Sequence, residues 1–375
     1  MRVLVTGGAG FVGLAVSRRL LAKGHTVTVL DSFHPQIHGS SQTLPPDLTE
    51  DVRLVRGDVA DREAWLRAID SQQAVLHLAA ETGTGQSMYE VERYSRTNLA
   101  GTALLLDLLA NKRAPSVERI VVASSRAIYG EGAYTCAEHG LVYPAARGVE
   151  RLTAGKFEPV CPLCEGEVLT VPTPESAPPS PSSFYGLTKQ VQEQMVLLFG
   201  ATLAIPTVAL RYQNVYGPGQ SLSNPYTGIL AIFSNLARLN RPIRIFEDGQ
   251  ESRDFVYIDD VAEATCRALL NDVSGVHSLN VGSGQRTSVL EVARHIVNFF
   301  GSRSELQVTG EFRLGDIRHG SADLTGLKQT LGYTPQWKFA DGLDRFLSWA
   351  SASAPEAAGY DRSLEEMRSR GLMGG

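Results

Sequence analysis

Two spacings of hydrophobic residues alternate along the first 130 residues of the chain. Short runs rich in Val, Leu, Ile and Ala predict strands buried on both faces, and stretches with apolar residues three and four apart predict helices. The strands are expected at residues 3–6, 26–31, 52–56, 74–78 and 119–124, and the helices at residues 11–23, 62–69 and 98–109. Because this alternation is typical of doubly wound folds, we expect an α/β Rossmann fold with a parallel sheet.

The pattern changes twice after residue 130. Residues 131–182 hold three of the four cysteines and many prolines, which predicts an insertion followed by a stiff connector. A helix at 185–199 and a strand at 207–212 follow, and then shorter, mixed elements predict a smaller α+β lobe that ends in a helix and a loose end at 351–375. The expected parts are a Rossmann domain at 1–130 and 183–213, a cysteine-bearing insertion at 131–182 and a substrate-binding lobe at 214–375.

Composition narrows the class of protein. The 375 residues include 35 basic and 40 acidic side chains, a net charge of −5 without a basic patch, so we expect no nucleic-acid partner. No apolar run reaches the ~18 residues needed to cross a bilayer, and the first residues lack the apolar stretch of a secretory signal. Four cysteines are too few for a disulfide scaffold. We therefore expect a cytoplasmic protein without a membrane partner.

A glycine-rich turn follows the first predicted strand. Its spacing is Gly7-x-x-Gly10-x-x-Gly13, and a helix begins within it. Glycines let the turn tighten and let the backbone approach a pyrophosphate at the helix N-terminus. The next strand ends at Asp31, whose carboxylate can accept hydrogen bonds from the adenosine ribose and repels a 2′-phosphate. These residues predict that NAD is bound in preference to NADP.

Two further signals place reactive groups on later elements. Tyr185 and Lys189 lie four residues apart, and so on one face of a predicted helix. A phenol has a pKa near 10, but a neighbouring ammonium and a cationic nicotinamide favour the phenolate that can accept a proton. Ser125 follows the fifth strand, at the sheet edge where ligands bind in such folds.

In this order, the motifs resemble those of the extended short-chain dehydrogenases/reductases, specifically the nucleotide-sugar epimerase/dehydratase family. The resemblance covers about residues 1–130 and 183–350. It implies that Ser125, Tyr185 and Lys189 form the catalytic set. The expected cofactor-binding residues include those that follow the third and fourth strands. They are Gly7, Gly10, Phe11, Val12, Gly13, Asp31, Asp58, Val59, Leu78, Ala79, Ala80, Asn98, Tyr185 and Lys189.

The resemblance also implies a nucleotide-diphosphate sugar as substrate. Segments 211–218 and 253–260 are similar to family segments that contact the diphosphate, and segment 313–316 is similar to one with a second phosphate-binding arginine. The guanidinium fork suits a diphosphate because it donates paired, charge-assisted hydrogen bonds. The expected substrate-binding residues are Ser125, Arg126, Asn214, Arg253, Arg313 and Arg318; Arg126 either contacts the substrate or reaches solvent.

The family resemblance implies transient oxidation of the sugar, usually at carbon 4, with the tyrosine taking the hydroxyl proton. Dehydratases and decarboxylases of the family carry a carboxylic acid just after the serine or threonine, where this chain has Arg126 and Ala127. A 4-epimerase needs no such acid, because the 4-keto sugar rotates and the hydride returns to its opposite face. We therefore favour 4-epimerisation and keep a 4,6-dehydratase, a 4-ketoreductase and a non-catalytic NAD-binding protein as alternatives.

The insertion contains two pairs of metal-ligating residues. Cys136 and His139 form one pair, Cys161 and Cys164 form the other, and 21 residues separate them. Three thiolates and one imidazole complete a tetrahedral zinc site without an open position, which predicts a structural, zinc-ribbon-like module. A reduced loop without metal is the alternative. Cys266 stands alone in a helical pattern and is expected in the core.

The family resemblance finally implies a homodimer. Members of the family commonly associate through the two helices that correspond to residues 98–109 and 185–199. The apolar residues expected at that interface are Leu104, Leu105, Leu108, Val191, Met195 and Leu198.

Overall fold

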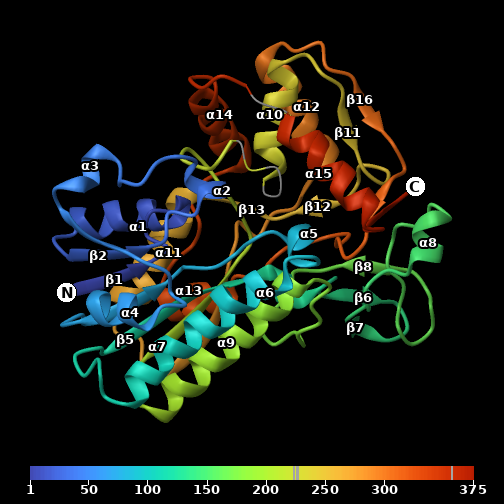
Figure 1. Cartoon of the computed structure of the whole chain (residues 1–375). Coiled ribbons are helices and arrows are strands. Elements are labelled where there is room, and N and C mark those ends of the chain that lie inside the picture. Colours follow the sequence, from blue (N-terminus) through green and yellow to red (C-terminus); the bar gives the residue numbers. More distant parts are fainter. Residues whose placement is uncertain (223, 225–227, 356–357) are drawn as a thin grey trace.

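A seven-stranded parallel sheet forms the centre of the larger lobe in the computed structural model, which describes residues 1–222, 224, 228–355 and 358–375 (Figure 1). The strand order is β3-β2-β1-β4-β5-β9-β14. The first strand shows why the apolar runs are continuous: Val3 and Val5 face one hydrophobic core, and Leu4 faces another on the opposite side. The strands are β1 (Arg2–Thr6), β2 (Thr26–Asp31), β3 (Val52–Arg56), β4 (Ala74–His77), β5 (Arg119–Ser125), β9 (Thr207–Tyr212) and β14 (Val276–Val281).

Helices cover both faces of this sheet, which confirms the expected doubly wound α/β class. One face carries α1 (Phe11–Ala22), α11 (Ile258–Leu270) and α13 (Thr325–Leu331); the other carries α4 (Arg62–Ile69), α7 (Gly101–Ala110) and α9 (Phe184–Thr202). In Figure 1, α7 and α9 lie side by side along the outer face. Short helical segments occupy the connections: α2 (Pro35–His38), α3 (Pro46–Thr49), α5 (Thr84–Ser87), α6 (Val91–Tyr94), the π-helical η1 (Ser95–Ala100) and the 3₁₀ segment η2 (Arg126–Tyr129).

After residue 213 the chain adds a further strand to the large sheet, although the sequence predicts only the smaller lobe there. Strand β14 pairs in parallel with β9, and Leu279 and Val281 are buried in the sheet core. Helices α11 and α13 pack with it on the sheet. The assignment of all of residues 214–375 to the smaller lobe therefore differs from the structure. The difference arises because β14 mixes polar and apolar residues and pairs with a strand far away in sequence.

The smaller lobe has its own hydrophobic core between helices and short strands. Its helices are α10 (Ile229–Arg238), α12 (Val289–Phe300), α14 (Phe339–Ala350) and α15 (Ala358–Ser369). Its strands are β10 (Asn214–Tyr216), β11 (Ile243–Ile245), β12 (Ser252–Arg253), β13 (Phe255–Tyr257), β15 (Thr287–Ser288), β16 (Leu306–Val308), β17 (Phe312–Arg313) and β18 (Met373–Gly374).

The end of the chain is not loose. Helix α15 agrees with the expected terminal helix, although residues 356–357 of that stretch lie outside the described residues. Strand β18 then pairs antiparallel with β17, and the Leu314 amide donates to the Leu372 carbonyl at 3.0 Å. The expectation of a free tail is wrong, because these backbone groups find partners in the smaller lobe.

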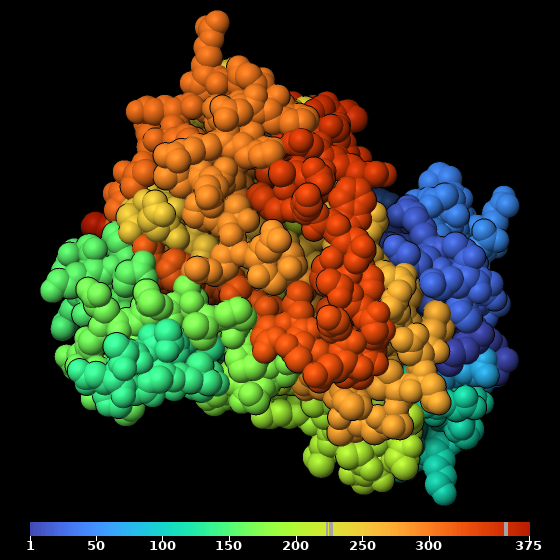
Figure 2. All heavy atoms as spheres, turned by 180° about the vertical axis from the view of Figure 1, so that it is seen from behind, coloured from blue at the N-terminus to red at the C-terminus, as the bar shows by residue number. Residues whose placement is uncertain are grey.

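The insertion folds as a small module beside the smaller lobe (Figure 2, green against orange). Strands β6 (Tyr134–Cys136), β7 (Gly140–Val142) and β8 (Val168–Thr170) form an antiparallel sheet in the order β7-β6-β8, and helix α8 (Val149–Thr153) follows β7. None of the helices in the described part of the chain is long and apolar enough to cross a membrane.

Candidate active site

The glycine-rich turn fits a pyrophosphate because it has no room for side chains. A Cβ atom on Gly7, whose φ is +66°, would lie 2.8 Å from the Ala79 amide nitrogen. A Cβ on Gly13 would lie 2.5 Å from the Gly7 carbonyl oxygen. Helix α1 begins directly after Gly10, so its free amide groups point to the turn. Both features suit the backbone approach that a dinucleotide requires.

Asp31 lies at the carboxyl end of β2, beside this turn. One carboxylate oxygen accepts from the Ala9 amide at 3.0 Å, and the other accepts from the Phe33 amide at 2.8 Å. Oδ2 keeps a further lone pair for a ligand hydroxyl, whereas Oδ1 also faces His38 Nε2 at 3.6 Å. The fixed carboxylate therefore fits the adenosine ribose of NAD.

Three of the other expected cofactor residues, Asp58, Ala79 and Asn98, are fixed by hydrogen bonds near the same edge of the sheet, whereas Val59 is buried in the core. Asp58 follows β3, and its side chain accepts from the Ala60 amide at 2.8 Å. The Ala79 amide donates to the Thr6 hydroxyl at 3.2 Å and holds the end of β4 against β1. Asn98 accepts from the Glu81 amide at 2.8 Å and donates to the Thr188 hydroxyl at 2.9 Å, and so ties this edge to helix α9.

Ser125 and Tyr185 meet at the end of β5. The Ser183 hydroxyl caps α9 by accepting from the Gly186 amide at 3.1 Å, which sets Tyr185 in the first turn. Burial raises the pKa of the Tyr185 phenol, whereas its hydrogen bond with Ser125 and the positive charge of Arg126 lower it. The cation that acts on this phenol in the structure is thus Arg126, whereas the sequence pointed to Lys189.

Lys189 is buried, and burial lowers its pKa to about 7. Its ammonium donates to the side-chain carbonyl of Gln192, whose amide donates to the Thr102 hydroxyl at 2.7 Å. His77 lies between the hydroxyls of Thr102, at 3.0 Å, and Thr6, at 2.7 Å. We call Lys189, Gln192, Thr102, His77 and Thr6 the buried polar chain. It connects the catalytic helix to the strand that carries the glycine turn.

Gln192 was not among the expected site residues. The available signal was its position three residues after Lys189 on one helix, a spacing at which side chains meet. That signal is weak, because most polar residues at this spacing face solvent.

A cavity between the lobes holds most of the expected substrate-binding residues. Its polar and aromatic lining includes Thr84, Arg126, Asn214, Arg244, Phe246, Glu251, Arg253, Arg313, Asp316 and Tyr360. Arg126 donates to the Asn214 side-chain carbonyl at 2.8 Å, and Arg253 pairs with Asp316 at 3.1 Å. The four arginines against two carboxylic acids make this cavity suited to a diphosphate.

Glu251 is a buried acid in this cavity that sequence reasoning missed. Among the described residues, its Oε2 atom has no hydrogen-bond partner. Burial raises its pKa to about 7, which the positive charge of Arg253 only partly offsets. A carboxyl in this state can both donate to and accept from a ligand hydroxyl.

Arg318 does not line the cavity, in contrast to its expected role. Its guanidinium is fully buried and pairs with Glu247 at 2.9 Å, Asp248 at 2.7 Å and Glu158 at 2.6 Å. With its donors used by these carboxylates, the side chain has no free edge for a substrate. The basic segment 313–318 could not reveal this, because the partners come from distant parts of the chain.

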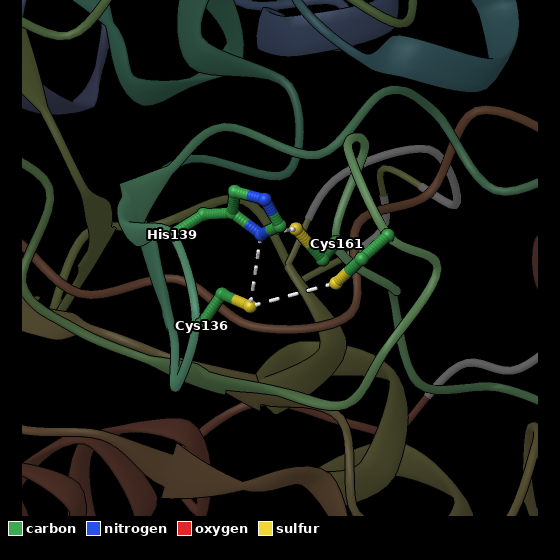
Figure 3. A group of neighbouring side chains, drawn as sticks. Cys136, His139 and Cys161 are labelled. Atoms are coloured by element: carbon green, nitrogen blue, oxygen red, sulfur yellow. Dashed lines mark hydrogen bonds between the residues drawn. The ribbon is translucent and has the colours of Figure 1, made fainter.

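The four predicted metal ligands converge in the insertion, and Figure 3 shows three of them, Cys136, His139 and Cys161. Their ligand atoms all lie within 4.8 Å of one another. The Cys136 and Cys164 sulfurs are 3.8 Å apart, and His139 Nδ1 is 3.6 Å from the sulfurs of Cys136 and Cys161. A tetrahedral zinc ion with bonds of ~2.3 Å to sulfur and ~2.0 Å to nitrogen requires edges of about 3.8 and 3.6 Å. The donors therefore fit zinc, and Cys266 lies apart in the sheet core, as expected.

The fold and this arrangement define the class: a dinucleotide-dependent enzyme whose tyrosine is influenced by Arg126, a residue that lines a cavity suited to an anionic ligand. The sequence profile of the NAD dependent epimerase/dehydratase family matches residues 3–146 and 164–282. The chain is also 43% identical over 350 residues to dTDP-L-rhamnose 4-epimerase of Burkholderia thailandensis, which covers 93% of this chain and 94% of the relative. It therefore belongs to the NAD dependent epimerase/dehydratase family, which confirms the resemblance drawn from its motifs.

Solved structures agree with this assignment. UDP-glucose 4-epimerase of Thermotoga maritima, determined with UDP-glucose, has a TM-score of 0.76 at 28% identity, over 94% of this chain and 99% of that one. UDP-glucose 4-epimerase of Thermus thermophilus, in complex with NAD, has a TM-score of 0.72 at 28% identity, over 94% of this chain and all of that one. The protein is an NAD-dependent enzyme of nucleotide-sugar metabolism.

Proposed function

We propose that the protein is a nucleotide-sugar 4-epimerase that acts on dTDP-L-rhamnose or its 4-epimer. The observation that carries this proposal is the arrangement beside Tyr185, where Arg126 lies instead of an acid that could protonate a leaving hydroxyl. The 43% identity to dTDP-L-rhamnose 4-epimerase supports the sugar and the base.

In the proposed reaction Tyr185 takes the proton of the hydroxyl on sugar carbon 4. Ser125 orients that hydroxyl, and Arg126 stabilises the phenolate that starts the reaction. The glycine turn and Asp31 would hold NAD, which would supply the acceptor and the donor of the hydride at carbon 4. Lys189 and the buried polar chain hold the helix that carries Tyr185 in register with the cofactor turn. Arg253 and Arg313 hold the diphosphate while the 4-keto sugar turns its other face.

Incubation of the enzyme with dTDP-L-rhamnose deuterated at carbon 4 tests this mechanism. We expect the 4-epimer, identified by NMR, with deuterium retained at carbon 4, a slowed rate and no uptake of solvent deuterium. Net consumption of NADH would indicate the 4-ketoreductase, and loss of water across carbons 5 and 6 of a 6-hydroxylated sugar nucleotide would indicate the 4,6-dehydratase. Binding of NAD without turnover of UDP-, dTDP- and GDP-sugars would support the non-catalytic alternative.

We also propose a preference for NAD over NADP, which rests on Asp31. Its carboxylate is fixed by two backbone amides and would repel a 2′-phosphate. Calorimetry should therefore give a lower Kd for NAD, and equal affinities would contradict the role of Asp31.

We assign one structural zinc ion to Cys136, His139, Cys161 and Cys164, because the distances between the donors match a closed tetrahedral site. No disulfide joins the cysteines of the described residues, which fits a reducing compartment, and we propose that the protein is cytoplasmic.

We further propose a homodimer through α7 and α9. Leu198 is 63% exposed on α9, and Leu104, Val191 and Met195 are half-buried. Leu105 and Leu108, which were also expected at the interface, are buried against the sheet and cannot contribute. The remaining apolar residues supply the surface for such a contact.

A further inference from the structure

The insertion is joined to the substrate cavity by buried charges. Arg147, whose side chain is 3% exposed, leaves the insertion and enters the smaller lobe. It pairs with Glu131 at 2.9 Å and with Glu247 at 2.8 Å. It also donates to the main-chain carbonyl of Asp316 at 2.9 Å. Its donors thus bridge the start of the insertion, the end of β11 and one residue that lines the cavity.

A second bridge runs through the main chain of Arg318. Glu131 accepts from the Arg318 amide at 2.8 Å, and Glu158 of the insertion pairs with the Arg318 guanidinium. Glu158 also faces His319 at 3.3 Å. Segment 316–319 is therefore fixed to the insertion at its backbone and at its side chains.

Segment 316–319 in turn fixes Arg253 in the cavity. The Arg253 guanidinium donates to the Arg318 carbonyl at 3.1 Å and to the Asp316 carboxylate at 3.1 Å. Since a guanidinium binds a diphosphate only in a defined orientation, a displaced segment would turn the fork of Arg253 away from its ligand.

The metal cluster joins the two parts of the insertion that contain Glu131 and Glu158. Glu131 lies five residues before Cys136, and Glu158 lies three residues before Cys161. A closed cluster would hold both acidic residues at a fixed separation.

We propose that Arg147 is a positioning residue for substrate binding, through which the insertion holds segment 316–319 and thereby orients Arg253 toward the substrate diphosphate. This inference rests on the proposed function, because it requires a nucleoside diphosphate in the cavity. It gives the insertion a role in the affinity for substrate, apart from the chemical step at Tyr185.

Calorimetry with dTDP and UDP tests the proposal on the NAD-bound enzyme. Arg147→Lys keeps the charge but loses the fork that reaches Glu131, Glu247 and Asp316 together. We expect the Kd of the preferred nucleotide and the KM of the sugar nucleotide to rise about tenfold, as for the loss of one charge-assisted hydrogen bond. The kcat, NAD content, zinc content and Tm should stay close to those of the wild type.

Lys156→Met serves as the matched control, since Lys156 is an exposed cation of the same insertion, whereas Arg151 donates to the Glu158 carbonyl and is therefore unsuitable. Glu158→Gln removes the charge that faces Arg318 and His319 from a half-exposed site, and provides a second variant should Arg147→Lys fold poorly. It should raise the same Kd by a smaller factor.

Unchanged nucleotide affinity in both variants would overturn the proposal. So would a loss of affinity accompanied by equal losses of NAD and Tm, because that result would show a structural role only. If the wild type binds neither dTDP nor UDP, the proposed function itself fails. If the wild type binds a nucleotide and the variants bind it equally well, only the role of Arg147 fails.

Discussion

Tyr185 is surrounded by groups that act in opposite directions on its proton. Burial raises its pKa, while Ser125 and Arg126 lower it. Arg126 is itself held by Asn214, so its charge remains close to the phenol. A residue that appeared unexplained in the sequence thus obtains a physical function beside the reacting hydroxyl.

The first prediction concerns Tyr185→Phe. The variant keeps the ring but cannot take the substrate proton, so kcat should fall by about 10²–10⁴-fold. Binding of NAD and of dTDP, measured by calorimetry, should remain close to that of the wild type. Ser125→Ala should cost less, because the serine orients the hydroxyl without carrying its proton. Wild-type turnover by Tyr185→Phe would remove Tyr185 from the mechanism.

A second prediction concerns the pH dependence of stability through Glu251. Its pKa is raised from 4.5 to about 7 in the folded chain, so the native state binds more protons than the unfolded state between these values. The free energy of unfolding should therefore decrease as pH rises: the contribution of Glu251 is complete below pH 4.5 and lost above about 7.

Glu251→Gln removes this dependence. Between pH 4.5 and 8 the variant should gain up to about 3 kcal/mol in stability relative to the wild type. Denaturant unfolding of the ligand-free protein measures the difference, with the exposed Glu92→Gln as control. A constant difference across this range would contradict the raised pKa.

The positions of residues that follow strands could be predicted from the sequence, because the end of a buried strand lies at the edge of the sheet. Ser125, Asp31 and the glycine turn belong to this group. Arg318 and Glu251 do not, because their surroundings come from segments far apart in the chain. Charge and local spacing cannot distinguish a guanidinium that lines a cavity from one used by buried carboxylates.

At the scale of elements, strands with a local apolar pattern could be predicted from the sequence, and strands that depend on distant partners could not. Most of the strands β1 to β5 contain continuous apolar runs, and the structure places all five at the expected positions to within one residue. Strand β14, with the sequence Val-His-Ser-Leu-Asn-Val, has no comparable pattern, and its place beside β9 is decided by tertiary contacts. The two-residue strand β18 likewise depends on its partner β17.

The third prediction concerns the insertion. Cys161→Ser removes one of four donors, so the purified protein should contain less than about a tenth of the zinc found in the wild type. Its Tm should fall by a few degrees, because ~1 kcal/mol corresponds to roughly 1 °C in a chain of 375 residues. Elemental analysis and calorimetry measure both effects.

Cys266→Ser provides the matched control, since it changes the same group outside the cluster. It should leave the zinc content unchanged. Absence of zinc from wild-type protein purified without a chelator would refute the assigned site.

At the scale of the whole molecule, two lobes with separate cores face each other across the substrate cavity. The chain crosses between them several times, because β14 returns to the sheet after the smaller lobe has begun. Helix α15 and the residue that follows it also contact the other lobe. Glu366 accepts from the Tyr89 hydroxyl at 3.2 Å, and the guanidinium of Arg370 lies 4.1 Å from the centre of the Tyr89 ring. These contacts restrict how far the lobes can separate.

The fourth prediction concerns assembly. A charge on the exposed face of α9 should disrupt the proposed four-helix interface, so Leu198→Glu should be monomeric where the wild type is dimeric. Light scattering at micromolar concentration measures the mass, and Leu239→Glu, at an exposed leucine on another element, should stay dimeric. A monomeric wild type at this concentration would contradict the proposal.

The terminal segment 358–374 has a consequence for the order in which activity is acquired during translation. Tyr360 lines the cavity, and β18 supports the strand that carries Arg313. All seven strands of the large sheet precede these residues in the chain, so they leave the ribosome first, and the cavity gains this wall only after segment 358–374 emerges. A stop codon placed just before residue 358 should therefore yield a protein that copurifies with NAD and fails to bind dTDP in calorimetry.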